Sequence, residues 1–215
     1  MSLAVDPPRR PALVHEILGR SDYAIISDII EPGSQVLDLG CGEAELLAWL
    51  VENKNVKARG VEINPGKVQK AIAKGVLVYQ GDLESSLRDY PDLTFDYVIL
   101  SQTLQQTVRP LQVLKEMLRV GRRAIVAFPN FGHWRVRWSH LVSGRSPRTP
   151  LFPYEWYNSP NIHFFTIDDF EDLVRKQRWQ IDKRIFLRGP HEAGFAPNLL
   201  AEVAVYLFHQ QQRIE

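Results

Sequence analysis

An acid followed by two glycines is the feature of this sequence best suited to ligand chemistry. Asp38, Gly40 and Gly42 lie in the stretch VLDLGCGE, residues 36–43, and a helix-forming segment follows over residues 43–52. Glycine lacks a Cβ, so a ligand can come close to the backbone N–H groups of such a strand-to-helix turn. We expect Asp38 to lie at the carboxyl end of the strand and to accept hydrogen bonds from a ligand or from the loop.

A second acid follows at a spacing typical of nucleotide-binding folds. Glu62 and Ile63 end the apolar run at residues 58–63, roughly two dozen residues after Asp38. Such folds place an acid at about that distance to accept hydrogen bonds from both ribose hydroxyls. We therefore predict this role for Glu62, the alternative being a solvated acid at a strand end.

A nicotinamide dinucleotide is the first ligand to consider for a glycine turn of this kind. Its G-x-G-x-x-G fingerprint requires a third glycine at position 45, where this chain has Glu45. A carboxylate there also disfavours a bound pyrophosphate. The order of acid and glycines instead resembles the first motif of class I S-adenosylmethionine (SAM)-dependent methyltransferases, although Ala44 occupies a position where that family often has glycine. A tight turn without a ligand is the alternative.

This resemblance implies roles for residues that follow the third and fourth predicted strands. It implies that Asp82 accepts a hydrogen bond from the adenine amino group and that Leu83 packs on the ring, whereas an Asp-containing turn is the alternative. Gln102 is expected beside the methionine part of the cofactor, although a polar helix start explains it nearly as well. We interpret Cys41 as a small space-filling residue and not as a nucleophile. The predicted cofactor-binding residues are Asp38, Gly40, Cys41, Gly42, Glu62, Ile63, Asp82, Leu83, Ser101 and Gln102.

The sequence assigns no catalytic residue. Methyl transfer to a weak nucleophile requires a general base, or a site that desolvates and orients the acceptor. Families that methylate amines of DNA and glutamine often have an Asn/Asp-Pro-Pro-Tyr/Phe tetrad after the fourth strand, but residues 101–104 read SQTL. His133 and His163 are candidate bases, although lone histidines near aromatic residues are more often packed or hydrogen-bonded. One cysteine excludes a multi-cysteine zinc site, and we expect no metal.

Apolar runs alternate with helix signals, which predicts an α/β fold. Two final β-prone runs, residues 179–187 and 200–208, have no helix between them and predict an antiparallel hairpin. This ending resembles the Rossmann-like class I methyltransferase fold, a seven-stranded, mostly parallel sheet with an antiparallel last strand and helices on both faces. We expect one domain over residues 1–215, with a loose lead-in at residues 1–12.

Composition bounds the possible functions. The 215 residues are 45% hydrophobic and 24% charged, which is ordinary for a globular protein. A net charge of +1 does not favour nucleic acid as a partner. No apolar run approaches the roughly 20 residues needed to span a bilayer, and the N-terminus lacks the order of a secretory signal. We therefore expect a cytoplasmic protein with no membrane partner.

An insertion rich in aromatic residues and arginine is predicted at residues 131–165, after the fifth strand. We expect it to be irregular, but Trp134 and Trp138 are four residues apart and would share one face of a helix. Trp, Tyr and Arg are enriched at interface hot spots, and long segments at this place commonly form lids. Residues 133–157 therefore have two interpretations, a partner surface or a lid that belongs to the protein's own interior.

Six motifs together resemble one family specifically, the methionine biosynthesis protein MetW. They lie between residues 30 and 186 and read VLDLGCGEAELL, GVEI, VYQGDLE, FDYVILSQTLQ, AFPNFGHWRVR and NSPNIHFFTIDDF. The resemblance implies a partnership with homoserine O-acyltransferase, the enzyme that acylates homoserine early in methionine synthesis. It favours an accessory subunit that binds SAM or S-adenosylhomocysteine (SAH). An active SAM-dependent methyltransferase on a small molecule is the alternative.

Overall fold

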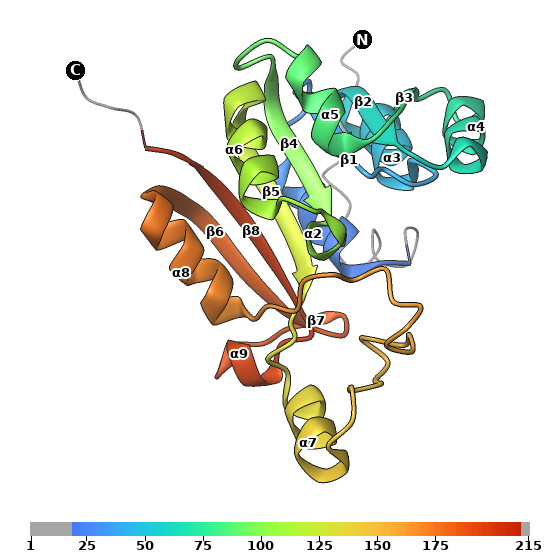
Figure 1. The fold of residues 1–215 in the computed structure, drawn as a ribbon. Helices are drawn as coiled ribbons and strands as arrows, with labels where there is room; N and C mark the ends of the chain where they lie inside the picture. The colour runs from blue at the N-terminus through green and yellow to red at the C-terminus, as the bar shows by residue number, and fades with distance from the viewer. Residues whose placement is uncertain (1–18, 212–215) are drawn as a thin grey trace, which may run out of the picture.

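The computed structural model describes residues 19–211, which form a twisted sheet with helices on both faces (Figure 1). The predicted lead-in at residues 1–12 lies outside the described residues. The strands are β1 (Gln35–Leu39), β2 (Lys57–Glu62), β3 (Leu77–Gln80), β4 (Phe95–Ser101), β5 (Gly121–Pro129), β6 (Trp179–Arg188), β7 (His191–Glu192) and β8 (Val203–Gln210). The α-helices are α2 (Ser21–Ile29), α3 (Glu45–Lys54), α4 (Pro65–Ala73), α5 (Leu83–Ser86), α6 (Pro110–Val120), α7 (Trp134–Ser143), α8 (Ile167–Gln177) and α9 (Pro197–Leu200), with 3-10 turns η1 (Leu87–Asp89) and η2 (Leu104–Gln106).

The sheet has the predicted mixed topology. Its strand order is β3-β2-β1-β4-β5-β8-β6-β7, and β1 to β5 pair in parallel. β8 runs antiparallel to both β5 and β6, which confirms the antiparallel hairpin at the end of the chain. The described sheet has eight strands and not seven, because the chain after β6 turns back in the two-residue strand β7.

Two apolar clusters lie on the two faces of the sheet. One joins residues of α6 and α8 to inward-facing residues of β4 and β5, such as Val98 and Val126. The other joins α2, α3 and α4 to residues of the same strands that point the opposite way, such as Ile99 and Ile125. Both faces of the central strands β1, β4 and β5 are therefore buried, which explains the apolar runs in their sequences.

The helix α4 begins where the sequence predicts, directly after β2. Asn64 caps α4 by accepting hydrogen bonds from Gly66 N and Lys67 N, at 2.9 and 3.2 Å, and Pro65 is the first helical residue, as predicted. The strand order reverses between β1 and β4, which are neighbours in the sheet: the chain goes from β1 to β2 and β3 on one side, and from β4 to β5 on the other. In such sheets the carboxyl ends of the strands at this switch point form a ligand crevice.

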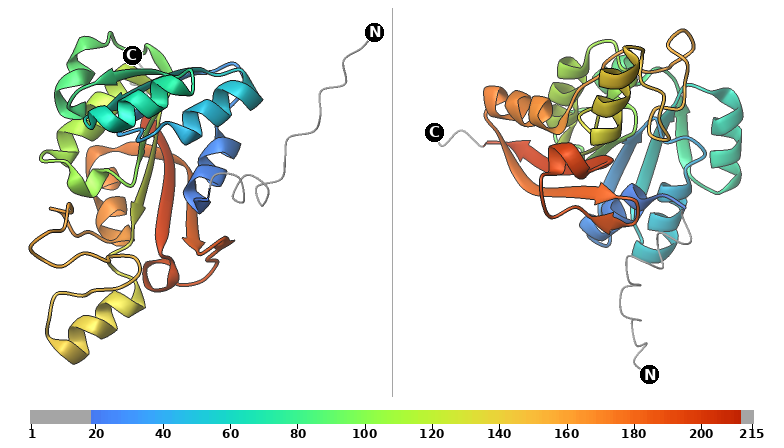
Figure 2. Two further views of the ribbon diagram at one scale, coloured as in Figure 1. Left: turned by 90° about the vertical axis from the view of Figure 1, so that its right-hand side faces the viewer. Right: turned by 90° about the horizontal axis from the view of Figure 1, so that it is seen from below.

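The segment after β5 differs from the prediction. Residues 134–143 form α7, so the expectation of an irregular insertion over residues 131–165 is wrong for this part. The helix projects from the lower end of the sheet in Figure 1 and in the left view of Figure 2. His133 caps it through a 3.4 Å contact between Nδ1 and Arg135 N, and Gly144 ends it in a left-handed conformation.

Within residues 19–211, no helix is both long enough and apolar enough to cross a membrane.

Candidate functional site

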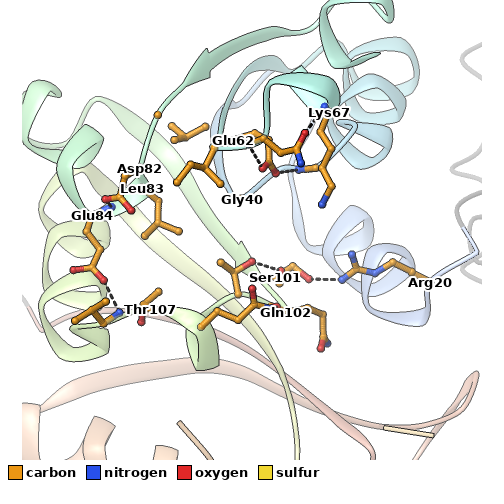
Figure 3. A pocket seen from close by; sticks show the side chains of 18 of the residues that line it. Arg20, Gly40, Glu62, Lys67, Asp82, Leu83, Glu84, Ser101, Gln102 and Thr107 are labelled. Atoms are coloured by element: carbon orange, nitrogen blue, oxygen red, sulfur yellow. Dashed lines mark hydrogen bonds between the residues drawn. The ribbon is translucent and has the colours of Figure 1, made fainter. Parts of the chain in front are cut away.

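A pocket of about 530 Å³ opens at the carboxyl ends of the parallel strands (Figure 3). The loops after β1, β2, β3 and β4 each contribute side chains or backbone to it, together with the start of α2. Predicted residues that line it are Gly40, Gly42, Glu62, Ile63, Asp82, Leu83, Ser101 and Gln102. Eight of the ten predicted cofactor residues thus meet at one place, although the sequence separates the first from the last by about sixty positions.

Glycine is required at position 40. Its φ is +74°, and a Cβ there would lie 2.9 Å from the Thr103 hydroxyl oxygen. The backbone N–H groups of Gly40 and Cys41 both donate to Val61 O, at 2.8 and 3.1 Å, so the loop folds back onto β2.

The Glu62 carboxylate is fixed by two backbone donors. Oε2 accepts from Gly42 N at 3.0 Å and Oε1 accepts from Asn64 N at 2.8 Å. The residue is buried, yet it lines the pocket. A carboxylate has about four acceptor sites, so two remain for a ligand. An oriented carboxylate with two remaining acceptor sites can accept hydrogen bonds from a pair of adjacent hydroxyl groups.

Asp82 is the N-cap of α5. It therefore has a structural role, as the alternative of an Asp-containing turn predicts. Its Oδ1 accepts from Glu84 N and Ser85 N, at 2.9 and 3.1 Å. Its Oδ2 accepts no hydrogen bond from another described residue. Beside it, Leu83 and the 67%-exposed Ile63 supply apolar surface to the same end of the pocket. This end combines a free carboxylate oxygen with apolar walls, which suits a planar ring that carries an amino group.

Asp38 and Cys41 lie behind the pocket wall and not on it. Both are buried, and neither lines the pocket. Burial raises the pKa of Asp38 to about 7, with the guanidinium of Arg20 opposing the shift and the carboxylates of Asp22 and Glu62 adding to it. The Cys41 sulfur fills the space above Gly60, where a Cβ would lie 2.5 Å from Sγ. This agrees with the interpretation of Cys41 as a space-filling residue.

Sequence reasoning missed a polar cluster around Arg20 at the other end of the pocket. Arg20 pairs with Asp22 at 2.5 Å, donates to the Ser101 hydroxyl at 2.9 Å, and donates to the Tyr23 hydroxyl at 2.8 Å. The Ser101 hydroxyl in turn donates to Asp22. Figure 3 shows Arg20 and Ser101 turned toward one another across the lower edge of the pocket. Arg20 precedes Ser101 by 81 positions, so no local signal in the sequence connects them.

Gln102 has a strained backbone between two hollows. Its φ is +55°, in the left-handed region, which costs a non-glycine residue about 1 kcal/mol or more. Its side-chain amide makes no hydrogen bond with another described residue. It lines the main pocket and also a neighbouring hollow of about 330 Å³, which Leu151 and Glu202 border on the far side. Strain of this kind is common at ligand sites.

The two candidate bases do not line the main pocket. His133 is buried at the start of α7 and lines a separate hollow of about 130 Å³ with Arg135 and Glu202. Burial lowers the pKa of its imidazole. The His163 backbone N–H donates to Gln105 O at 3.0 Å, and its Nε2 is buried without a hydrogen-bond partner among the described residues. Both histidines therefore lie in packed surroundings.

Comparison with known protein families shows to which family this chain belongs. The family described as "Methionine biosynthesis protein MetW" matches residues 20–208. The chain belongs to the MetW family. The match begins at Arg20 and includes every residue that lines the main pocket.

A relative of this MetW family protein comes from Rhodopirellula baltica and is described as a bifunctional methionine biosynthesis protein MetXA/MetW. It is 38% identical over 221 residues, which cover 97% of this chain and 36% of the relative. The chain thus spans about a third of the length of that relative. The fused protein carries a MetXA function beside its MetW function, as its name states.

Solved structures share the fold at low sequence identity. A SAM-dependent methyltransferase from Thermotoga maritima, described as a possible histamine N-methyltransferase, matches with a TM-score of 0.64 and 20% identity, over 93% of this chain and 92% of that one. The [4+2]-cyclase SpnF matches with a TM-score of 0.61 and 17% identity, over 93% and 80%. A protein described as a cyclase has the same fold, so the fold alone does not establish methyl transfer.

Proposed function

We propose that this MetW family protein binds SAM or SAH in the main pocket and acts in methionine biosynthesis as an accessory partner of homoserine O-acyltransferase. The observation that carries the ligand assignment is the position of Glu62. It lies between the glycine loop and Asp82, with both carboxylate oxygens oriented by backbone donors. A pocket of about 530 Å³ is within the range of small-molecule sites, roughly 300–1,000 Å³.

In the proposed binding mode, the ligand runs along the carboxyl ends of the strands. The adenine lies between Ile63 and Leu83, and its amino group donates to Asp82 Oδ2. Both ribose hydroxyls donate to Glu62. The methionine part extends past Gly40 toward Ser101 and Gln102, where the free amide of Gln102 faces it. This arrangement uses the features of the pocket that the protein itself leaves unsatisfied.

The charges of the pocket favour such a ligand over a dinucleotide. Three acids line it, Glu62, Asp82 and Glu84, against two basic residues, Arg20 and Lys67, of which Arg20 is already paired with Asp22. A pyrophosphate would face these carboxylates, whereas SAM is a cation at its sulfur and carries no phosphate. Glu45 at the start of α3 also occupies the place of the third glycine of the dinucleotide fingerprint.

The partnership rests on the comparisons and not on the pocket. The relative from Rhodopirellula baltica is described with both names, MetXA and MetW, and the present chain matches about a third of it. We infer that the partner is the homoserine O-acyltransferase of the same pathway. Joining two proteins in one chain raises their effective concentration, commonly to the millimolar range, and so favours pairs that associate.

An active methyltransferase is the second candidate function. The hollow of about 330 Å³ next to the main pocket shares Arg20 and Gln102 with it, and so offers space for an acceptor molecule. Neither candidate base from the sequence lines these two cavities: His133 lines the separate hollow of about 130 Å³, and His163 lines neither the main pocket nor the neighbouring hollow. Among residues 19–211, the two histidines that could act as bases therefore lie outside the proposed acceptor site, which favours the accessory role.

Calorimetric titration tests the proposal. SAM, SAH and NAD are each titrated into the purified protein, with and without the homoserine O-acyltransferase of the same organism. We expect micromolar or tighter binding of SAM or SAH, no comparable binding of NAD, and a complex between the two proteins. Tight binding of NAD alone would overturn the ligand assignment, and the absence of a complex would overturn the partnership.

A further inference from the structure

Helix α7 has its apolar face on the outside. Trp134, Trp138, Leu141 and Val142 occupy positions i, i+4, i+7 and i+8, which form one stripe on a helix. All four are exposed, Trp138 by 62% and Leu141 by 77%. On the opposite side, Val136 is the one buried residue of α7. A helix that only packed against its own domain would have the reverse arrangement, so this stripe indicates a contact with another molecule.

The base of α7 is firmly held, so the stripe is presented in a fixed orientation. Asn130 donates to Asn198 O and Ala201 O, both at 3.0 Å, and accepts from Gly132 N at 2.9 Å. Gly132 is required there, because a Cβ would lie 2.5 Å from the Asn198 side chain. Arg137 also donates to Gly132 O. A rigid surface loses little conformational entropy when a partner binds, which favours association.

The charges around the stripe restrict the occupant. Arg135 and Arg137 flank it on its two sides, and α7 itself contains no acidic residue, although the carboxylate of Glu202, just before β8, lies 3.8 Å from the Arg135 guanidinium. A second copy of α7 packed on the first would bring arginines together without a carboxylate from either helix. A partner that fits must therefore offer an apolar groove bordered by acidic side chains.

We propose that the Trp134–Val142 stripe of α7 is the docking surface for homoserine O-acyltransferase, and that this enzyme provides an acidic-bordered apolar groove for it. This inference rests on the proposed partnership and adds the surface through which the two proteins associate. Within α7 the observations favour a partner surface over a lid, because neither Trp134 nor Trp138 lines the main pocket and both are exposed. Tryptophans at the centre of an interface are typical hot spots.

Binding measurements on three variants test this surface. Trp138→Ala and Leu141→Ala are compared with Ile72→Ala, a matched control that removes an exposed apolar side chain from α4 on another part of the sheet. Affinity for the full-length acyltransferase is measured by calorimetry, SAH affinity by the same method, and the fold by thermal unfolding. We expect at least a tenfold loss of partner affinity for Trp138→Ala and Leu141→Ala, no change for Ile72→Ala, and unchanged SAH affinity in all three.

The outcomes separate this inference from the proposed function. A complex that forms in the unsubstituted protein and tolerates both α7 substitutions would overturn the docking surface but leave the partnership standing. A protein that binds SAH but forms no complex would overturn both the partnership and this occupant. Sedimentation that shows a dimer dissociated by Trp138→Ala would replace the acyltransferase by a second copy of this chain. Weaker binding of the acyltransferase at higher salt would support the proposed acidic side chains around its groove, because salt screens their attraction to Arg135 and Arg137.

Discussion

The carboxylate of Glu62 accepts a hydrogen bond from the backbone N–H of Gly42 at 3.0 Å. This contact joins the end of β2 to the glycine loop after β1, two parts of the chain that are 20 residues apart. The acid therefore has two tasks: it shapes the loop, and it presents acceptor sites to the pocket. Substitutions of Glu62 must be designed so that these two tasks can be told apart.

Replacement of Glu62 is expected to weaken SAH binding. Glu62→Ala should cost about 1.5–3 kcal/mol, roughly ten- to a hundredfold in affinity, because the ribose hydroxyls lose a charged acceptor. Glu62→Gln keeps one oxygen for Gly42 N and should lose less. Calorimetry measures the affinities, and Glu52→Ala on the exposed face of α3 is the control. Unchanged SAH affinity in Glu62→Ala would contradict the assignment.

Asp82 is expected to select the adenine amino group. S-inosylhomocysteine has a carbonyl oxygen in its place, which would face the Asp82 carboxylate, so the unsubstituted protein should bind SAH at least tenfold more tightly. Asp82→Asn retains a side-chain oxygen for the α5 cap but adds a donor, and should narrow this preference to about threefold or less. Competition binding of the two ligands measures it. Equal affinities in the unsubstituted protein would exclude this role.

Asp38 is expected to make the stability of the fold depend on pH. Its pKa is about 7 in the folded protein and about 4 in an unfolded chain, so between these values the folded state holds a proton that the unfolded state releases. The contribution of Asp38 to the free energy of unfolding therefore falls as pH rises from about 4 to 7 and then levels off.

Asp38→Asn removes this dependence. Its free energy of unfolding relative to that of the unsubstituted protein should rise with pH across the same window, as measured by urea unfolding at several pH values without ligand. The exposed substitution Asp89→Asn serves as the comparison. A stability difference that stays constant from pH 5 to pH 8 would show that Asp38 does not titrate there.

The purified protein is expected to transfer little or no methyl group to small acceptors. The structural reason is the position of His133, which caps α7 and lines a hollow separate from the main pocket. Incubation of the protein and a cell extract with radiolabelled SAM measures transfer directly. Strong labelling of one metabolite, abolished by Asp38→Ala, would instead support the methyltransferase alternative.

Local sequence signals predict which strand-end residues gather at the main pocket. Glycines between an apolar run and a helix signal, a proline at the first helical position and acids after apolar runs each have a meaning that depends on their immediate neighbours. Parallel strands place their carboxyl ends at one edge, so Gly40, Glu62 and Asp82 had to meet once the strands paired. The resemblance to the MetW family rested on the same local motifs.

Other features depend on contacts between distant parts of the chain, and only the tertiary structure decided them. Arg20 reaches Ser101 because α2 packs beside the end of β4, and no spacing in the sequence encodes that approach. The stripe of α7 has the periodicity of a buried face, yet Trp138 lies in solvent while Val136 is buried. Periodicity shows that a helix has an apolar face, but which face meets the protein is decided by the packing around it.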